Sequence, residues 1–427
     1  MSPHAAVSKQ PSRQPVTAGL ASMVGTTIEW YDFFLYGTAA ALIFNKLFFP
    51  AFDPLTGTLA AFATYAVGFL ARPLGAVVFG HYGDRLGRKS MLLATLLLMG
   101  IPTTAIGLIP TYESIGYTAA VLLVLMRFLQ GMAVGGEWGG AALMAVEHAP
   151  EGRRAFFGSL PQAGVGAGLI LSSLAMSAVS QLPEEDFLSW GWRLPFLASI
   201  VLLGVGAFIR LKVAESPAFA ELKNSGRQVD MPVLEVMRQH PRAVLTAAGT
   251  RMAETTWFYT VVTFSLSYIT QQLGLPKALA LEAIVAGALV SLLTIPLAGM
   301  ACDRFGARRV FMTGAVLIAL GSVVFFQLLA SRDPSLLFLA MILAIGAVFP
   351  LVYAPQSALF SAQFPPEVRY SGISLSVQIA GAVAGGAAPL VATSLLAAGK
   401  GSPWMISFYL AVLAVIALLC CARLKDA

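Results

Sequence analysis

The hydrophobic positions of this chain form long, nearly continuous runs separated by short polar segments. Most runs are close to the ~20 apolar residues that cross the hydrocarbon core of a bilayer as a helix, the first and fourth are longer, and such runs recur along the whole sequence. The pattern predicts an all-α polytopic membrane protein with twelve transmembrane helices. Their expected bounds are residues 16–44, 58–80, 90–109, 117–146, 155–179, 194–209, 243–269, 278–299, 310–330, 335–360, 370–396 and 402–419.

The longest polar interruption divides these runs into two sets of six. It predicts an N-terminal six-helix bundle over residues 1–211, a cytoplasmic linker over 212–242 and a C-terminal six-helix bundle over 243–427. A linker of this length and charge is typical of a chain built from two halves. We therefore expect two pseudo-symmetric six-helix bundles.

Short motifs that occur once in each half support this duplication. The segment "GHYGDRLGRK" (80–89) is echoed by "GMACDRFGARR" (299–309), and each copy contains an Asp-Arg pair followed by a glycine and basic residues. The segment "PEGRR" (150–154) is echoed by "PEVRY" (366–370), and Gln162 is matched by Gln378 at the same offset. Parallel repeats of this kind are typical of transporters whose substrate site lies between the halves.

Composition and charge agree with a membrane protein. Of the 427 residues, 57% are hydrophobic and only 11% are charged, against about 25% charged residues in a soluble globular protein. Nineteen of the 27 Lys and Arg residues fall in loops and tails that are cytoplasmic if the N-terminus is inside, and five fall in the outer loops. This asymmetry predicts that both termini are cytoplasmic. It also explains the net charge of +6 without a nucleic-acid partner.

The sequence has none of the motifs of an enzyme. It contains no phosphate-binding loop, no cluster of metal ligands and no nucleophile beside a general base. The three cysteines do not have the spacing of a disulfide framework, and the N-terminal segment does not have the form of a cleavable signal peptide. We therefore expect no catalytic activity, no cofactor and no metal.

Seven charged residues fall inside the predicted spans, where each costs about 2.5–3.5 kcal/mol to insert. They are Glu29, Asp32, Arg72, Arg127, Glu137, Arg251 and Glu254. If every base is paired, four acids and three bases leave one carboxylate over, and burial favours the neutral form of that group. A carboxyl group that can be loaded with a proton is what a proton-coupled carrier needs.

Glu29 and Asp32 are the candidates for proton coupling. They lie three residues apart and therefore share one face of the first predicted helix. We expect one of them to pair with Arg72 or Arg127 and the other to carry the proton. The sequence does not decide between the two acids.

Two arginines and several polar or aromatic side chains are candidates for substrate contact. Arg127 is expected roughly 15 Å into its span, near the bilayer centre. Arg251 either pairs with Glu254, three residues on, or binds a substrate carboxylate with its bidentate guanidinium group. The other candidates are Tyr31, Tyr36, Gln162, Trp257, Tyr259 and Gln378, of which the aromatic ones are alternatively packing contacts. Arg72, Glu137 and Glu254 complete a predicted charge network, in which Glu137 is expected to be structural.

The repeated Gly-Asp-Arg-Gly-basic loop is the most specific signal in the chain. Its occurrence at the equivalent turn of each half favours a conformational latch over a loop that only fixes membrane topology. The predicted gating residues are Gly80, Asp84, Arg85, Gly87, Arg88, Glu147 and Arg153 in the first half, and Gly299, Asp303, Arg304, Gly306 and Arg308 in the second.

These loops and their neighbouring segments resemble the major facilitator superfamily. "RFLQGMAVGGEWGGA", "GFLARPLGAVVFGHYGDRLGRK", "EHAPEGRR", "SWGWRLPF" and "ESPAF" resemble its metabolite:proton symporter branch, and "GGEWGGAALM" and "RMAE" resemble bacterial shikimate permeases. The resemblance implies the major facilitator fold and a role for Arg127 with substrate or proton. The family's antiporters carry a Gly-Pro pattern in the fifth helix, which "GVGAGLILSS" does not reproduce, so symport is favoured.

The resemblance also implies partners for the gating loops. In the family an acid at the end of the fourth helix pairs with the loop, and Glu147 fits this role. The equivalent position in the second half is Gln363, so the second lock is expected to be weaker or to use Glu367.

The expected function is secondary active transport across a bacterial inner membrane by a monomer. The cargo would be a small organic anion, shikimate or a related carboxylate, taken up with protons by alternating access. One alternative is uptake of a zwitterionic osmolyte; members of that kind resemble chains with a long cytoplasmic C-terminal coiled coil, whereas this sequence ends at Ala427. The other is a transporter-like membrane sensor, for which a cytoplasmic output domain would be expected.

Overall fold

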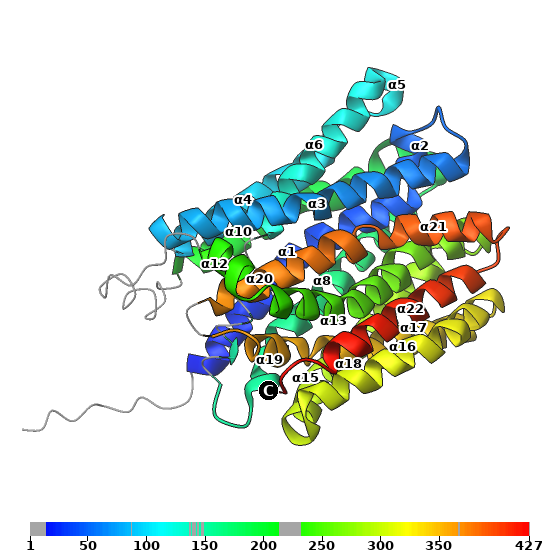
Figure 1. Ribbon diagram of the computed structural model, residues 1–427. Helices are drawn as coiled ribbons and strands as arrows, with labels where there is room; N and C mark the ends of the chain where they lie inside the picture. Colours follow the sequence, from blue (N-terminus) through cyan, green and yellow to red (C-terminus); the bar gives the residue numbers. More distant parts are fainter. Residues whose placement is uncertain are drawn as a thin grey trace, which may run out of the picture.

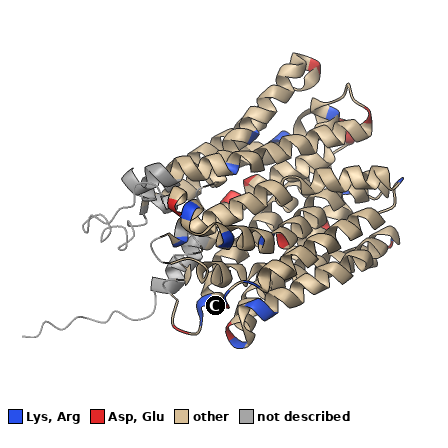
Figure 2. Ribbon diagram, in the orientation of Figure 1, with Lys and Arg blue, Asp and Glu red and all other residues tan. Residues whose placement is uncertain are grey.

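The computed structural model describes residues 14–86, 88–135, 138, 142, 145–146, 149–212, 232–365 and 368–426. Every element within these ranges is helical, and the long helices run side by side from one end of the molecule to the other (Figure 1). Charged residues gather mainly at the two ends of this bundle, and a few lie in its middle (Figure 2). The predicted linker falls largely outside the described residues.

The first half contains six long helices, each of which overlaps one of the predicted spans. They are α1 (Gln14–Leu42), α3 (Pro54–Leu86), α4 (Arg88–Ile106), α6 (Tyr117–Val134), α8 (Arg154–Ser180) and α10 (Arg193–Lys212). Shorter elements connect them: α2 (Phe44–Phe48), α5 (Tyr112–Ile115), α9 (Glu184–Asp186) and the π-helical η1 (Phe187–Gly191). Helix α12 (Pro232–Gln239) precedes the second half and packs against α13 and α20.

The second half repeats this arrangement with more broken helices. The seventh predicted span is α13 (Pro241–Tyr259), η2 (Thr260–Phe264), α14 (Ser265–Ser267) and η3 (Tyr268–Gln272). The next two are α15 (Lys277–Phe305) and α16 (Ala307–Ala330). The tenth is α17 (Pro334–Met341), η4 (Ile342–Val348), α18 (Phe349–Tyr353) and α19 (Gln356–Ser361). The last two are α20 (Arg369–Ala380), η5 (Gly381–Gly385) and α21 (Ala388–Ala398), followed by α22 (Trp404–Cys421).

Nine helices within the described residues are long and apolar enough to cross a membrane. Helices α1 and α13, which contain the buried acids Glu29, Asp32 and Glu254, are not among the nine, and the described apolar part of α4 is short. Large apolar side chains on the outside of the bundle are strongly exposed, as is typical of a surface that faces lipid; examples are Leu293, Leu320 and Phe408.

The π-helical segment η4 has a local cause in the sequence. Pro350 has no backbone N–H, so the carbonyl oxygen of Gly346 lacks its normal partner within the helix. The hydroxyl group of Thr294, from α15, donates a hydrogen bond of 2.6 Å to that oxygen instead. The irregular backbone is thereby satisfied inside the protein, as a membrane environment requires.

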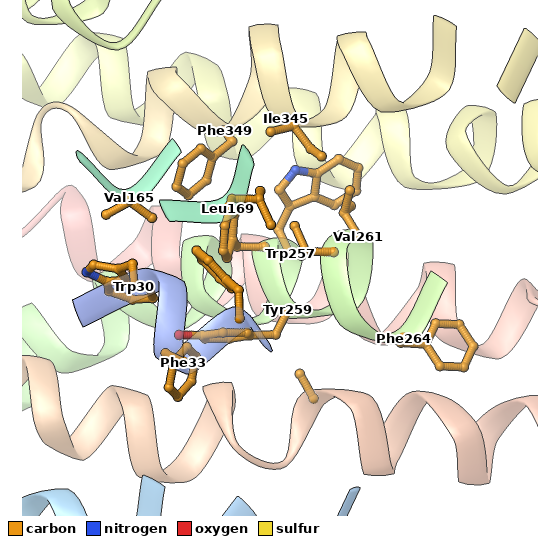
Figure 3. Close-up of a cluster of buried hydrophobic side chains, with 14 of the residues drawn as sticks. Trp30, Phe33, Val165, Leu169, Trp257, Tyr259, Val261, Phe264, Ile345 and Phe349 are labelled. Atoms are coloured by element: carbon orange, nitrogen blue, oxygen red, sulfur yellow. The ribbon is translucent and has the colours of Figure 1, made fainter. Parts of the chain in front are cut away.

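The two halves pack through α8 against α15 and through α3 against η5 and α21. An aromatic cluster fills the middle of this contact (Figure 3), where Phe33 of α1 lies 5.7 Å, between ring centres, from Tyr259 of α13. Phe69 of α3 lies 5.0 Å from the same tyrosine. Gly386 makes room for Phe69, because a Cβ atom there would lie 2.7 Å from the Phe69 side chain.

Close packing of α3 against α6 depends on small residues, which gives the first prediction. A Cβ atom at Gly131 would lie 2.0 Å from the carbonyl oxygen of Gly68, and overpacking of this kind costs about 1–3 kcal/mol. Gly131→Ala is therefore expected to lower the Tm of the purified protein in detergent. The matched control is Gly204→Ala in α10, where no atom lies within 4 Å of the added Cβ. Equal Tm values for the two variants would contradict this packing.

Candidate functional site

Helices α1, α3 and α6 bring two buried guanidinium groups to the aromatic cluster. The guanidinium carbon of Arg72 lies 4.0 Å from the ring centre of Phe69 and 4.7 Å from that of Phe33. The guanidinium carbon of Arg127 lies 4.5 Å from the ring centre of Phe33 and 4.4 Å from that of Tyr36. Phe33 is thus flanked by two cations, an arrangement that cation–π attraction favours. The space for Arg127 exists because residue 68 is glycine: a Cβ atom there would lie 2.6 Å from Arg127 Nε.

Most of the hydrogen-bonding capacity of these two arginines is unused. Arg127 Nη1 donates a hydrogen bond of 3.2 Å to Gln130 Oε1, and Gln130 Nε2 donates one of 2.7 Å to Thr103 Oγ1. The Nε and Nη2 atoms of both Arg72 and Arg127 are buried and have no acceptor within the described part of the chain. Each unsatisfied buried group carries a desolvation cost of about 1–3 kcal/mol. The pair is therefore prepared to bind hydrogen-bond acceptors.

Asp32 lies beside Arg127 but does not form an ion pair with it. The two residues line a narrow crevice between α1, α4 and α6, which has no room for a water molecule. Asp32 is buried, and its Oδ1 atom has no hydrogen-bond partner among the described residues. Pairing of Asp32 with Arg72 or Arg127, one of the pairings that the sequence allowed, is thus not formed in this structure. Glu29 is buried one turn earlier on the same helix.

The predicted tyrosine and tryptophan contacts are engaged in different ways. The Tyr31 hydroxyl donates a hydrogen bond of 2.9 Å to the Pro195 carbonyl, and the Tyr36 hydroxyl donates one of 2.7 Å to Thr64. Trp257 Nε1 donates to the Ala344 carbonyl inside the second half. Tyr36 and Tyr259 therefore lie at the arginine cluster, whereas Tyr31 and Trp257 lie in the interior of their own halves.

Gln162 and Gln378, which the repeat places in equivalent positions, both bridge the two halves. Gln162 Nε2 donates a hydrogen bond of 2.6 Å to Ser357 Oγ, and Gln378 Nε2 donates one of 3.2 Å to the carbonyl oxygen of Gly135. The Oε1 atom of each glutamine is buried and has no partner among the described residues. Each amide therefore keeps one free acceptor at the contact between the halves.

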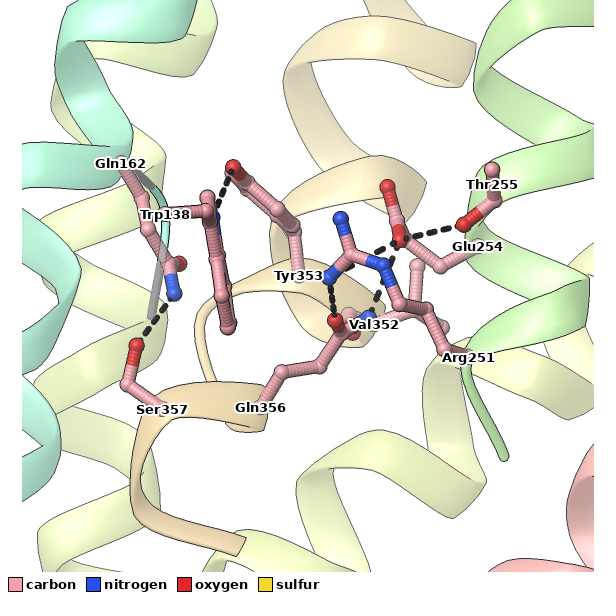
Figure 4. Close-up of polar contacts among 9 residues, drawn as sticks. All are labelled: Trp138, Gln162, Arg251, Glu254, Thr255, Val352, Tyr353, Gln356 and Ser357. Atoms are coloured by element: carbon pink, nitrogen blue, oxygen red, sulfur yellow. Dashed lines mark hydrogen bonds and ion pairs between the residues drawn. The ribbon is translucent and has the colours of Figure 1, made fainter. Parts of the chain in front are cut away.

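A second buried cluster surrounds Arg251 (Figure 4). Arg251 Nη1 lies 3.8 Å from Glu254 Oε2 and donates its hydrogen bond to Gln356 Oε1. The Arg251 guanidinium carbon lies 4.9 Å from the ring centre of Trp138, which belongs to the first half. Trp138 Nε1 donates a hydrogen bond of 3.4 Å to the Tyr353 hydroxyl. Arg251 and Glu254 thus form a loose ion pair, and Arg251 faces the other half as well.

The gating residues that can be placed occupy one end of the bundle. The Asp303 carboxylate accepts hydrogen bonds of 2.9 and 3.0 Å from the backbone N–H groups of Ala155 and Phe156. Asp303 of the second half therefore caps the N-terminus of α8 in the first half. Arg153, Gly299, Arg304, Gly306 and Arg308 lie around this contact or at the adjoining turn. The side chains of Asp84, Arg85 and Arg88, all of Gly87, and the acids Glu137, Glu147 and Glu367 lie outside the described residues, and Gly80 is placed only by its backbone in α3.

Several contacts at the gates were not predicted. Gln363, which stands where the family has an acid, exchanges two hydrogen bonds with the backbone of Lys425. Asp426 Oδ1 accepts a hydrogen bond of 3.1 Å from the Arg308 backbone N–H. At the other end, Glu184 binds Lys46 of its own half at 2.9 Å and Lys277 of the second half at 3.0 Å. The halves are therefore in contact at both ends of the bundle.

The sequence and structure of this chain are similar to those of known membrane transporters. The "Sugar (and other) transporter" family profile matches residues 17–230, and the "Major Facilitator Superfamily" profile matches residues 246–426. The chain is 43% identical to the "Shikimate transporter" of Escherichia coli (strain K12), covering 96% of this chain and 94% of the relative. It is 40% identical to the "Inner membrane metabolite transport protein YhjE" of the same organism, covering 94% and 92%. The structure of the proton:xylose symporter XylE bound to 6-bromo-6-deoxy-D-glucose superposes with a TM-score of 0.75, at 16% identity, over 96% of this chain and 94% of that chain.

The Asp303 cap gives the second prediction. Asp303→Ala removes two hydrogen bonds to a charged acceptor, each of which contributes about 1.5–3 kcal/mol. Ser159→Cys introduces a reporter thiol in α8, beside Gly299 of the second half. Because loss of the cap lets the halves separate more often, we expect this thiol to react roughly tenfold or more faster with a membrane-impermeant thiol reagent in the Asp303→Ala variant than in its absence. The measurement uses inside-out vesicles and a background in which Cys302, Cys420 and Cys421 are serine.

Asp333→Ala is the matched control. Asp333 accepts hydrogen bonds from the backbone N–H groups of Ser335 and Leu336 and so caps α17 within one half. Its loss removes the same kind of interaction without freeing the other half. Equal labelling rates in the Asp303 and Asp333 variants would show that the Asp303 cap does not hold the halves together.

Proposed function

Because this chain belongs to the major facilitator superfamily and is a multi-pass membrane transporter of small molecules, we propose that it takes up a small organic anion together with protons. The observation that carries this proposal is the buried pair Arg72 and Arg127, whose Nε and Nη2 atoms have no acceptor among the described residues. A carboxylate is acceptor-only and binds arginine through two parallel hydrogen bonds. An anionic substrate would therefore satisfy the pair.

The surroundings of the arginine pair support a hydroxylated ring acid as the substrate. Phe33, Tyr36, Tyr65 and Tyr259 present aromatic faces and phenol groups next to the two guanidinium groups. Aromatic faces suit an apolar ring, and phenol groups exchange hydrogen bonds with hydroxyl groups. Shikimate, the substrate in the printed name of the relative that is 43% identical, has this chemistry and is our first candidate.

A zwitterionic osmolyte fits this site less well. Such a ligand carries a positive group that would have to sit close to Arg72 and Arg127, and like charges repel strongly in a buried environment. The charge balance of the described cluster therefore favours a ligand with net negative charge.

Asp32 is proposed as the residue that takes the proton. It shares a crevice with Arg127 and has a carboxylate oxygen without a partner among the described residues. A proton on Asp32 would offset the negative charge that the substrate brings, so that cargo and proton together cross as a less charged unit. Glu29, three residues earlier on the same helix, is the second proposed carrier.

Alternating access would proceed by separation of the halves at one end at a time. Opening toward the cytoplasm requires the Asp303 cap and the Gln162–Ser357 bond to break, and opening outward requires the Glu184–Lys277 contact to break. Since one chain contains both halves, we propose that a monomer is sufficient. We propose the bacterial inner membrane as its location, with both termini in the cytoplasm.

The proposed function is tested in proteoliposomes with a panel of radiolabelled carboxylates that includes shikimate. An inward proton gradient should drive accumulation of at least one of them above equilibrium, and a protonophore should abolish the accumulation. Accumulation that is unaffected by the protonophore would overturn proton coupling.

Asp32→Asn gives the third prediction. The variant keeps the shape of the side chain and cannot exchange a proton, so counterflow exchange of substrate should persist while uphill accumulation is lost. Both are measured in the proteoliposome assay. Asp186→Asn, at an exposed position in α9, is the control and should accumulate substrate normally. Full accumulation by Asp32→Asn would remove Asp32 from proton coupling.

The fourth prediction concerns substrate affinity. Arg72→Gln and Arg127→Gln each remove charge-assisted hydrogen bonds worth about 1.5–3 kcal/mol, so the Kd for the transported acid should rise roughly 10- to 150-fold. Isothermal titration calorimetry on the purified protein measures it. Arg193→Gln is the control, because Arg193 lies over Trp192 but donates its hydrogen bonds to the Gly107 and Ile109 carbonyls. A wild-type Kd in both test variants would place the substrate elsewhere.

A further inference from the structure

The cluster around Arg251 lies where the two halves meet (Figure 4). Arg251 belongs to α13 of the second half, and its guanidinium group lies over Trp138 of the first half, 4.9 Å from the ring centre. On the second-half side, the ring centre of Tyr353 in α18 lies 6.0 Å from the guanidinium carbon of Arg251. A separation of the halves would therefore take Trp138 away from Arg251 and expose the guanidinium group between them.

Arg251 and Glu254 are held together by a third residue more than by each other. Their closest charged atoms are 3.8 Å apart, which is longer than a hydrogen bond. Gln356 accepts a hydrogen bond from Arg251 Nη1 and donates one of 3.1 Å to Glu254 Oε2. The amide of Gln356 therefore connects the cation to the carboxylate, and the ion pair is loose enough to be exchanged.

Arg251 has an unused hydrogen-bond donor, and the hydrogen bonds that Glu254 accepts from Gln356 and Thr255 both reach the same carboxylate oxygen. Arg251 Nε is buried without an acceptor among the described residues. Glu254 Oε2 accepts hydrogen bonds of 3.1 Å from both Gln356 and Thr255. A ligand carboxylate that binds Arg251 would leave two carboxylates around one guanidinium group. The excess negative charge would be buried, which is costly unless a proton neutralises it.

We propose that Glu254 is a proton-carrying residue that takes up a proton when a carboxylate ligand binds Arg251. This inference rests on the proposed function, and it assigns to the second half a coupling step of its own. In the step, a hydronium ion gives up a proton to Glu254: one O–H bond of hydronium breaks, one O–H bond forms on the carboxyl group, and a water molecule is left. The guanidinium group of Arg251 transfers its hydrogen bonds to the ligand carboxylate. Ligand and proton thereby enter the second half together.

The groups that act on Glu254 are few. They are Arg251 and Tyr259 of the same span and Tyr353 of α18. Among the described side chains, the other charged or titratable ones on the elements packed against α13 are Tyr409, Cys420 and Cys421 of α22, Glu235 and Arg238 of α12, Arg308 and Arg309 of α16, and Arg369 of α20. Cys420 lies against Gly249, more than one helical turn from Glu254. Arg251 is therefore the principal charge that the ligand would take over.

The test counts the protons that are taken up when shikimate binds to the purified protein. Calorimetric titrations in buffers of different ionisation enthalpy give this number directly. Wild-type protein should take up protons on binding, and Glu254→Gln should bind shikimate and take up one proton fewer. Glu254→Asp should restore the lost proton. Glu282→Gln, the same substitution at an exposed position of α15, should match the wild type.

Each outcome separates this inference from the proposed function. If Glu254→Gln binds shikimate with the wild-type number of protons, the inference is overturned while proton-coupled anion uptake stands. If wild-type protein binds neither shikimate nor any other carboxylate of the panel, the proposed function fails and this inference fails with it.

Thr255→Val provides the test if Glu254→Gln does not fold. It keeps the size of the side chain and removes one hydrogen bond to the Glu254 carboxylate. The carboxylate is then less well stabilised before the ligand arrives, so part of it already carries the proton at neutral pH. Fewer protons should therefore be taken up on binding than in the wild type. An unchanged number would overturn the inference.

Discussion

The buried guanidinium groups of Arg72 and Arg127, lying against Phe33 without enough hydrogen-bond acceptors among the described residues, are the constraint on which the rest of this structure depends. Removing an ion from water costs several kcal/mol even after relaxation, and cation–π attraction returns only about 0.5–2 kcal/mol. The described part of the protein therefore stabilises the two cations incompletely. A bound anion would supply what is missing, and this makes the cluster a site for a negatively charged cargo rather than a packing feature.

The contacts between the halves differ in strength between the two ends of the bundle. At one end, Glu184 is exposed and Lys277 is partly exposed, with side-chain exposures of 55% and 23%, and such surface pairs contribute about 0.2–1 kcal/mol. At the other end, Asp303 caps the start of α8 with two charge-assisted hydrogen bonds, each worth about 1.5–3 kcal/mol. The glutamines Gln162 and Gln378 add one bridge each near the centre. These polar contacts add to the apolar packing of α8 against α15 and to the aromatic cluster between the halves.

The sequence predicts the architecture well because each helix that crosses a membrane needs a long apolar run, which is visible in the hydropathy of the sequence. Every predicted span overlaps a helix or a series of consecutive helices. Gln162 and Gln378, which the internal repeat matches, each donate a hydrogen bond to the other half. The positions of the buried charges were also visible, since a charged residue inside an apolar run is conspicuous.

The partners of those charges could not be predicted, because they depend on helix rotation and on contacts across the halves. Counting acids against bases allowed a pairing of Asp32 with Arg72 or Arg127, whereas the structure places aromatic rings around both arginines. Gln356 gives no signal in the sequence, yet it connects Arg251 to Glu254, and the motif that contains Trp138 does not indicate that its ring lies against Arg251. At η4, Pro350 is visible in the sequence, but the partner of the carbonyl oxygen that it leaves free is Thr294 of another helix, which the sequence does not indicate.

The most direct test of this account compares the binding of one transported acid with the binding of its methyl ester. The ester keeps the ring and the hydroxyl groups and lacks the negative charge. If the unsatisfied guanidinium groups are the anion site, the ester should bind to wild-type protein roughly a hundredfold more weakly or not at all, since two charge-assisted contacts are worth about 3 kcal/mol or more. Equal affinity for acid and ester would show that the buried arginines do not form the anion-binding site, and the account would be wrong.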